Sequence, residues 1–462
     1  MRWIVASAIA MGCSGSNPDA GREAWVVSQL LSDDKVWLDR DPSLVATKWA
    51  VMAADPYDFM RGSLGMWARD LARPAPDRPR FDLLDVPTVR LVVGDPHPEN
   101  FGTFLSASAD RATGLAFEVN DLDAASYGTW SVDVRRGAMG LALMVDVAPC
   151  TSCATEAVDA YARAYADAVS GGAAVEIDGC GALVTSLASS VREDLGSDHT
   201  LTKDTTAEGV LVREPMDEVG KGMLDLTDDE RGQVSHLFDQ LAAAHVAPPN
   251  LRLLDAVRRF GRGVASLPAV RYLWLVDQGQ DGVADDELVQ VREVVDPPQL
   301  PGVIRPTDGE FADPTSRVQA ASALLWPRAD LDPWLAALSD DGQTFKVQAF
   351  GDGFQGLDHA DVAAAIAEGD VAAADAADLG RCLGSRLGAT HRRAPGLGPL
   401  DGPDVIPRAL AGRVDTFAGE VTRAAELDSA RAVSDRALLA TALAADGPLL
   451  GADDVFAGEG AW

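Results

Sequence analysis

Positive charge is scarce in this 462-residue chain, which carries 39 basic residues against 71 acidic ones and a net charge of −32. Lysine is the rarer basic residue, and its five copies are Lys35, Lys48, Lys203, Lys221 and Lys346. Nucleic acids and anionic membrane surfaces bind basic clusters, so this composition argues against either one as the main partner. Beyond the first residues, no stretch is apolar and long enough to span a bilayer. The length allows two or three domains, or one large two-lobed one.

The first 20 residues have the pattern of a targeting segment. MRWIVASAIAMGC places one basic residue before a short apolar run that ends in small residues ahead of Cys13. It resembles a bacterial lipoprotein signal that is cleaved before Cys13 and lipidated on its sulfur, and residues 14–20 would then be a tether. We expect an exported protein, anchored by this lipid in the periplasm or at the outer membrane. An ordinary N-terminus on a cytoplasmic protein is the alternative.

Cysteine is scarce as well, and the four copies after Cys13 allow few roles. Cys150 and Cys153 are close enough to form a disulfide in an oxidising compartment. A zinc site would need a second pair at similar spacing, which the chain lacks. We expect Cys180 and Cys382 to be buried free thiols.

Hydrophobic patterning divides the rest of the chain into three regions. Residues 21–254 are mainly helical, with strands expected at 88–94 and 115–121, and residues 181–250 within them have a helical pattern. Residues 255–350 are rich in β-formers and predict a small antiparallel sheet. Residues 351–462 are Ala-rich and helical. The pattern predicts an α+β protein with a largely helical large lobe and a smaller β-rich one.

Two strand ends carry residues that suit phosphoryl transfer. The strand that ends at Val93 continues as GDPHPEN, which places Asp95 five residues before Asn100, and the next strand ends at Asp121. Phosphoryl transfer requires an acid near the acceptor hydroxyl and oxygen ligands that hold Mg²⁺ on the phosphates. We expect Asp95, Asn100 and Asp121 to converge within reach of one metal ion.

The motifs around these residues carry a family resemblance. GDPHPEN resembles the G-D-x-H-x-x-N motif of aminoglycoside and choline phosphotransferases. More narrowly, the chain resembles the bacterial domain-of-unknown-function family 2252, from about residue 45 to about residue 395. Three motifs of that family occur in order: Phe59-Met60-Arg61-Gly62, Gly94 to Gly102, and Asn120-Asp121-Leu122-Asp123.

The resemblance implies a two-lobed kinase-like fold that uses ATP and Mg²⁺. Asp95 would be the catalytic aspartate that accepts the proton of the attacking hydroxyl, and Asn100, Asp121 and Asp123 would bind the metal. His97 would orient Asp95, contact the substrate or satisfy a buried carboxylate, and we favour a structural role for it. The substrate, a small molecule or a protein, is not implied by the resemblance.

The nucleotide-binding part departs from the family pattern. The Gly-rich hairpin of the family corresponds to GVASLP, residues 263–268, where only the first glycine remains. Gly263 and Ser266 would contact the nucleotide, together with Arg292 and Lys346 on the following strands. Arg292 stands where the family has Lys, and Arg does not replace Lys neutrally. Because these strands follow the catalytic loop, the lobes would come in permuted order.

For other polar residues near the motifs we expect structural roles. Arg61 should pair with an acid, Asp133 should cap backbone N–H groups near the catalytic loop, and His391 should be structural at a helix end. We expect Arg135 and Arg136 on a helix surface.

Three functions stay open. The first is a phosphotransferase that moves a phosphoryl group from ATP to a hydroxyl of a small molecule or a protein. The second is a catalytically inactive kinase-fold binding module, which the missing glycines favour. The third is a metal-dependent hydrolase with Asp95, His97, Asp121 and Asp123 around one ion. Export would count against the first, because ATP is scarce outside the cytoplasm.

Overall fold

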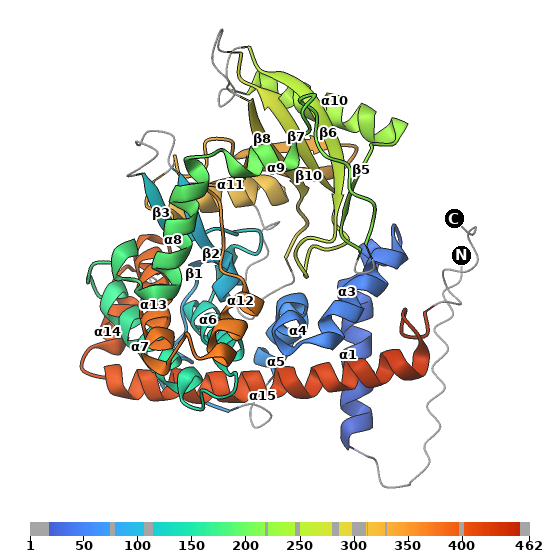
Figure 1. The fold of residues 1–462 in the computed structure, drawn as a ribbon. Coiled ribbons are helices and arrows are strands. Elements are labelled where there is room, and N and C mark those ends of the chain that lie inside the picture. Colours follow the sequence, from blue (N-terminus) through green and yellow to red (C-terminus); the bar gives the residue numbers. More distant parts are fainter. Residues whose placement is uncertain are drawn as a thin grey trace.

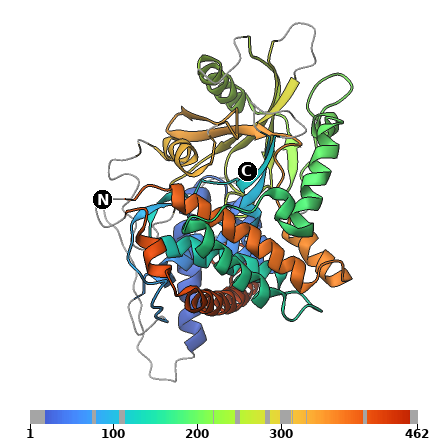
Figure 2. The same ribbon diagram turned by 90° about the vertical axis from the view of Figure 1, so that its left-hand side faces the viewer.

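The computed structural model describes residues 18–73, 79–105, 114–217, 220–244, 250–279, 286–297, 311, 313–328, 330–396 and 402–452. The leader with Cys13 lies outside this range. In the described part, helices combine with antiparallel sheets, and a six-stranded sheet lies at one end of a mainly helical body in both views (Figures 1 and 2). The mixed α/β character expected from the patterning is confirmed.

The N-terminal segment forms the helices expected for residues 21–71. They are α1 (Pro18–Asp33), α2 (Lys35–Leu38), α3 (Pro42–Ala54), α4 (Pro56–Gly62) and α5 (Leu64–Leu71). Asp41 and Asp55 cap α3 and α4 with their carboxylates, and each is followed by a proline that suits the first helical turn. The F-x-R-G motif therefore lies on α4.

Short strands then place the two motifs that were expected to carry chemistry. Strand β1 (Arg90–Val92) leads through the short helix η1 (Pro98–Asn100) into β2 (Phe101–Leu105). Strand β2 pairs with β3 (Leu115–Val119), and β1 pairs with β4 (Ser126–Gly128). Both expected strands are thus confirmed. They lead into helix α6 (Trp130–Val145), which is buried on nearly every side.

The helical body is held together by a very close helix pair. It contains α7 (Cys153–Val169), η2 (Ile177–Gly179), α8 (Gly181–Leu195), α9 (His199–Asp204), α12 (His359–Glu368), α13 (Ala373–Arg393), α14 (Val405–Leu410) and α15 (Val414–Asp446). Glycines at 380, 384 and 388 of α13 face the α7 backbone, where an added Cβ would lie 2.0–2.6 Å from carbonyl oxygens. The long α15 runs along the base of the body (Figure 1).

Two disulfides lie in this body. The Cys150–Cys153 bond forms as the spacing suggested. The prediction of free thiols at Cys180 and Cys382 is wrong, because these residues form a second disulfide that ties the start of α8 to α13. They are 202 residues apart, and only the packing of the helices brings them together.

The six-stranded sheet is antiparallel, as expected for residues 255–350. Its order is β5 (Gly222–Leu224), β6 (Arg252–Phe260), β7 (Arg271–Asp277), β8 (Asp286–Glu293), β10 (Gln343–Phe350) and β9 (Ala336–Asp340). Strand β5 comes from a stretch that was expected to be helical. Helix α10 (Asp228–Ala243) packs on one face with Val234, Leu237 and Leu241, and α11 (Pro314–Leu325) lies beside β9 and β10.

None of the helices in the described ranges combines the length and the apolar character needed to cross a bilayer.

Candidate functional site

The loop after β1 depends on a glycine and on a buried carboxylate. Gly94 has φ +88°, and a Cβ there would lie 2.1 Å from the carbonyl oxygen of Ala124. Asp133 on α6 accepts hydrogen bonds from the backbone N–H groups of Val93 (2.7 Å) and Gly94 (2.8 Å). The carboxylate also contacts His391 Nε2 at 2.8 Å. The structural roles expected for Asp133 and His391 are therefore confirmed.

Asp95 is buried at the start of this loop and is held by an arginine. Arg136 Nε donates to Asp95 Oδ1 at 2.6 Å, and its Nη2 donates to the carbonyl of Met60 at 2.7 Å. The expectation that Arg136 lies on a helix surface is wrong: its side chain is fully buried, because α6 is covered on that side by α4 and the β1–β2 loop. His97 Nε2 lies 3.8 Å from Asp95 Oδ2.

His97 is uncharged at neutral pH. Burial lowers the pKa of its imidazole to about 4, which outweighs the opposing effect of Asp95. Its Nδ1 has no hydrogen-bond partner in the described structure. His97 therefore adds no positive charge beside Asp95, in keeping with a mainly structural role.

The β2–β3 hairpin brings the ends of two motifs together. Phe101 pairs with Val119, so Asn100 and Asn120 flank the same end of the hairpin, and Asn120 N–H donates to the carbonyl of Asn100 at 3.0 Å. Asp121 follows directly. Asn100 Nδ2 donates to the carbonyl of Asp95 at 2.8 Å. This hydrogen bond ties the end of the hairpin to residues 94–100, which we call the catalytic-loop candidate.

A cluster of two carboxylates and two cations joins the hairpin to the six-stranded sheet. Arg292 on β8 contacts Asp121 at 2.9 Å and also bonds Asp123. Lys346 on β10 contacts Asp123 at 2.6 Å and Asp121 at 3.6 Å. Burial would raise the pKa of Asp121, but the two cations outweigh it and hold that pKa well below its usual value. The same carboxylates raise the pKa of Arg292 against the opposing effect of burial.

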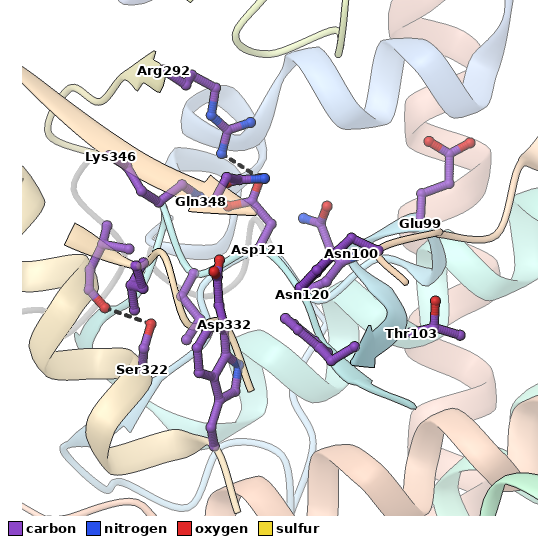
Figure 3. A pocket seen from close by; sticks show the side chains of 16 residues that line it. Glu99, Asn100, Thr103, Asn120, Asp121, Arg292, Ser322, Asp332, Lys346 and Gln348 are labelled. Atoms are coloured by element: carbon purple, nitrogen blue, oxygen red, sulfur yellow. Dashed lines mark hydrogen bonds and ion pairs between the residues drawn. The ribbon is translucent and has the colours of Figure 1, made fainter. Parts of the chain in front are cut away.

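The cluster opens into a cavity of about 190 Å³ (Figure 3). Asn100, Asn120 and Asp121 enter it from the hairpin end, and Arg292 and Lys346 enter it from the sheet. Glu99, Thr103, Asp332, Gln348 and several apolar side chains complete the lining. A polar cavity of this size suits the polar end of a small ligand.

Asp332 is a buried carboxylate in the wall of this cavity. It accepts backbone hydrogen bonds from Trp334 at 3.0 Å and from Ala349 at 3.1 Å. Burial nevertheless raises the pKa of its carboxyl group to about 6. The group therefore changes its charge close to neutral pH.

A second network of charges lies on the other side of Glu99. Its carboxylate contacts Arg61 at 2.9 Å and His359 Nδ1 at 2.8 Å. Burial would raise the pKa of Glu99, but His359 and Arg61 lower it to about 2. Arg61 also contacts Asp58 at 3.2 Å, which confirms that the arginine of the F-x-R-G motif pairs with acids. This network fixes α4 and α12 around the catalytic-loop candidate.

Several residues predicted for the site do not line the cavity itself. Asp95 and His97 lie in the loop before Asn100, whose side-chain amide joins the Asp95 backbone to the lining. Gly263 and Ser266 lie in a turn whose Val264 and Ala269 pack into the apolar cluster of the N-terminal helices. Ser266 Oγ accepts a hydrogen bond from Arg271 at 3.1 Å. Cys13 is outside the described residues.

The donor set fits a magnesium ion. Mg²⁺ prefers carboxylate and amide oxygens and keeps several waters. Asn100 uses its amide nitrogen on Asp95, which leaves its side-chain oxygen for a ligand. Asp121 supplies a carboxylate in the cavity lining, and Asp123 supplies a second one that shares the cations Arg292 and Lys346 with it. Both carboxylates are bound by Arg292 and Lys346, so a metal would have to replace part of these contacts.

Sequence reasoning missed Arg136, Glu99 and Asp332. Arg136 could have been found from its position three residues after Asp133, because that spacing places both on one side of α6 and near the same loop. Glu99 stands inside the GDPHPEN motif. Asp332 carries no such signal, since it lies in a short segment between α11 and β9.

Comparison of the chain with known proteins and protein families identifies one family. No curated protein and no solved structure matches the chain. A protein family described as "uncharacterized protein conserved in bacteria" (DUF2252) matches residues 40–441, which is most of the chain. The chain therefore belongs to the bacterial DUF2252 family.

Proposed function

We propose that this protein is a kinase-like phosphotransferase that moves a phosphoryl group from ATP, with Mg²⁺, to a hydroxyl of a small molecule or a protein. The observation that carries the proposal is the cluster of Asp121, Asp123, Arg292 and Lys346 at a cavity that Asn100 also lines. Oxygen ligands and cations at one cavity are the two requirements for holding Mg²⁺ and phosphates.

Arg292 and Lys346 would hold the phosphates. Each now bonds carboxylates, and both side chains are buried at the edge of the cavity. Phosphate oxygens offer the same geometry to a guanidinium as a carboxylate does, so Arg292 can exchange one partner for the other. Asn100, Asp121 and Asp123 would hold Mg²⁺, which bridges the phosphates and neutralises the charge that develops on them.

Asp95 would accept the proton of the acceptor hydroxyl. Arg136 holds its Oδ1, which leaves Oδ2 for another partner, and the neutral His97 does not compete with it by charge. Asn100 links the two halves of the site, because it bonds the backbone of Asp95 and also lines the cavity. Asp95 would act as a general base in this way.

Titration calorimetry with Mg·ATP, joined to an assay for release of the terminal phosphate, tests the proposal. The wild type should bind Mg·ATP. Asp95→Asn should bind it with similar affinity and turn over at least about 100-fold more slowly, since a general base contributes about that much. Asp121→Asn should lose the metal-dependent part of binding. Asp415→Ala is the control, because this aspartate is almost fully exposed on α15.

Two results would contradict the proposal. An absence of heat from the wild type would exclude a nucleotide enzyme, and equal binding by all four proteins would exclude Asp121 as a metal ligand.

A catalytically inactive kinase-fold binding module is the second candidate. The turn with Gly263 favours it, because Val264 and Ala269 are buried in the N-terminal core, and Pro268 lacks an N–H for a phosphate. For this candidate Mg·ATP or another ligand would bind without turnover in the wild type. The hydrolase has less support: in the described residues Asp95, His97, Asp121 and Asp123 do not form one metal-ligating group.

A further inference from the structure

Four basic side chains form a row across one face of the six-stranded sheet. Arg271 on β7 is directly opposite Arg292 on β8, and Arg292 is directly opposite Lys346 on β10. Arg258 on β6 is opposite Tyr272, so the next residue, Arg259, is level with Arg271. Directly opposite residues on antiparallel strands project from the same face. The row is therefore Arg259, Arg271, Arg292 and Lys346.

This row lies on the face that α10 does not cover. Along β7, Tyr272 and Trp274 belong to the core under α10, whereas Leu273 and Leu275 pack in the apolar cluster of the opposite face. Because side chains alternate along a strand, Arg271 projects with Leu273 and Leu275. All four basic side chains are at least nine-tenths buried.

Nearby carboxylates form ion pairs with only two of the four basic side chains in the row. Asp121 and Asp123 form ion pairs with Arg292 and Lys346. Within the described ranges, Arg271 has one hydrogen-bond partner, the hydroxyl of Ser266, and no ion pair. In the same ranges, the Arg259 side chain has no hydrogen bond and no ion pair. Its Nε is buried without a partner, and its guanidinium lies over the Phe350 ring at 4.3 Å.

Such an arrangement is costly for the folded protein. A buried charge without a partner carries a large desolvation penalty, and like charges on facing positions repel. Burial lowers the pKa of Arg271 well below its usual value, and Arg292 and Arg259 add to this effect, which Asp121 and Asp123 offset only in part. Burial lowers the pKa of Arg259 to about 10, and Arg262 adds to that effect. Asp204 and Glu214 offset only part of this at Arg259. Proteins retain destabilising arrangements of this kind mainly at functional sites.

We propose that Arg271 and Arg259 form a second oxyanion subsite beside Arg292 and Lys346, which takes a phosphate-type group. Guanidinium groups bind phosphate in a bidentate manner, and an anion would supply the charge that the two arginines lack. This subsite needs only the charges of the sheet and does not rest on phosphoryl transfer.

The row of four basic side chains is longer than one triphosphate group. Four adjacent strands span about 14 Å, because neighbouring strands are about 4.8 Å apart. A triphosphate is shorter, since two bridging oxygens link its three phosphorus atoms. The additional phosphate-type group thus comes either from a longer polyphosphate chain or from a second molecule.

Binding of inorganic tripolyphosphate and of inorganic phosphate, without metal or nucleotide and at constant ionic strength, tests the subsite. Calorimetry should show binding to the wild type, and Arg271→Gln should weaken it at least tenfold. The matched control is Arg258→Gln, because Arg258 precedes Arg259 on β6 and is equally buried, but lies near Glu230 of α10. The control should bind like the wild type.

Thermal stability gives a readout that a purely structural arginine would not produce. In anion-free buffer Arg271→Gln should melt no lower than the wild type, because it removes a buried charge that has no ion pair, and added tripolyphosphate should stabilise the wild type and the control more than Arg271→Gln. No anion binding by the wild type, or equal binding by Arg271→Gln, would overturn the proposal. Arg259→Gln repeats the test if Arg271→Gln fails to fold.

Two further titrations distinguish the sources of the phosphate-type group. If a longer chain occupies the row, affinity should rise from tripolyphosphate to longer polyphosphates, and Arg271→Gln should abolish that rise. If a second molecule occupies the subsite, inorganic phosphate should still bind to protein saturated with tripolyphosphate.

Discussion

Individual residues in the site are held by partners that also restrict them. Arg136 fixes one oxygen of Asp95, and Asn100 fixes the backbone of the same residue. Arg292 and Lys346 neutralise the carboxylates that would bind a metal. The carboxylates and cations are thus paired with one another, and a metal ion or phosphate bound here would have to replace part of these contacts.

Gly94 should be much less tolerant of a side chain than another glycine with the same backbone conformation. Gly94→Ala places a Cβ against the carbonyl of Ala124, whereas Gly369 has φ +85° and open space around it. Gly369→Ala should cost about 1 kcal/mol for the left-handed conformation alone. Gly94→Ala should cost a further ~1–3 kcal/mol from overpacking. Urea unfolding of both variants measures the difference, and equal costs would show that the loop can shift.

Asp332 should make stability depend on pH between its unfolded and folded pKa values. Its folded pKa of about 6 lies above the ~3.9 of an unfolded chain, so the folded state binds the proton more tightly. Its contribution to the free energy of unfolding is complete below about pH 4 and falls as the pH rises through about 6. From pH 4 to pH 7 the wild type should lose about 2 kcal/mol relative to Asp332→Asn.

Urea unfolding of the wild type and Asp332→Asn across this pH range tests the prediction. Asn retains an oxygen acceptor for the N–H groups of Trp334 and Ala349, so packing should change little. A difference between the two proteins that does not vary with pH would contradict a raised pKa.

At the scale of whole elements, two kinds of contact order the helical body. The glycines of α13 allow its backbone to approach that of α7, and the Cys180–Cys382 bond ties α13 to the start of α8. The short strands β1 to β4 carry the catalytic-loop candidate and the hairpin, and α6 supplies the side chains that hold them. The site thus depends on the rigidity of α6, α7 and α13.

The two disulfides should differ strongly in their effect on stability. The chain-entropy account gives about 5 kcal/mol for closing a loop of about 200 residues and about 2 kcal/mol for a loop of four. The Cys180→Ala/Cys382→Ala variant should therefore lose about 3 kcal/mol more than Cys150→Ala/Cys153→Ala. Denaturant unfolding under non-reducing conditions measures both, and equal losses would show that the loop length does not govern the effect.

At the scale of the molecule, charge is distributed unevenly. The chain has a net charge of −32, and yet the face of the six-stranded sheet opposite α10 carries four buried basic side chains in one row. Disulfides persist mainly in oxidising compartments, so the two in this chain support the proposed export.

Lipid attachment at Cys13 is the prediction that decides the compartment. Metabolic labelling with a fatty acid should mark the wild type and leave Cys13→Ala unlabelled and released from membranes, because the sulfur of that residue would carry the lipid. An unlabelled wild type found in the cytoplasm would contradict export. It would also remove the objection that ATP is scarce where the protein works.

The local features of this protein can be predicted from its amino-acid sequence. The strands that end at Val92 and Val119, the helices of the N-terminal segment and the β-rich block all follow from periodicity and from residues that cap or end an element. The motifs GDPHPEN and Asn120 to Asp123 also identified the family, because their residues lie close together in the chain.

Which of these residues are partners depends on the packing of segments that lie far apart in the sequence. Asp121 meets Arg292 and Lys346 across more than 160 residues of sequence, Arg136 turns inward to Asp95, and Cys180 pairs with Cys382. The row of four basic side chains also depends on the register of four strands, which no single strand specifies. Local patterns determine the direction and the period of a segment, whereas ion pairs, disulfides and strand register depend on packing between distant segments.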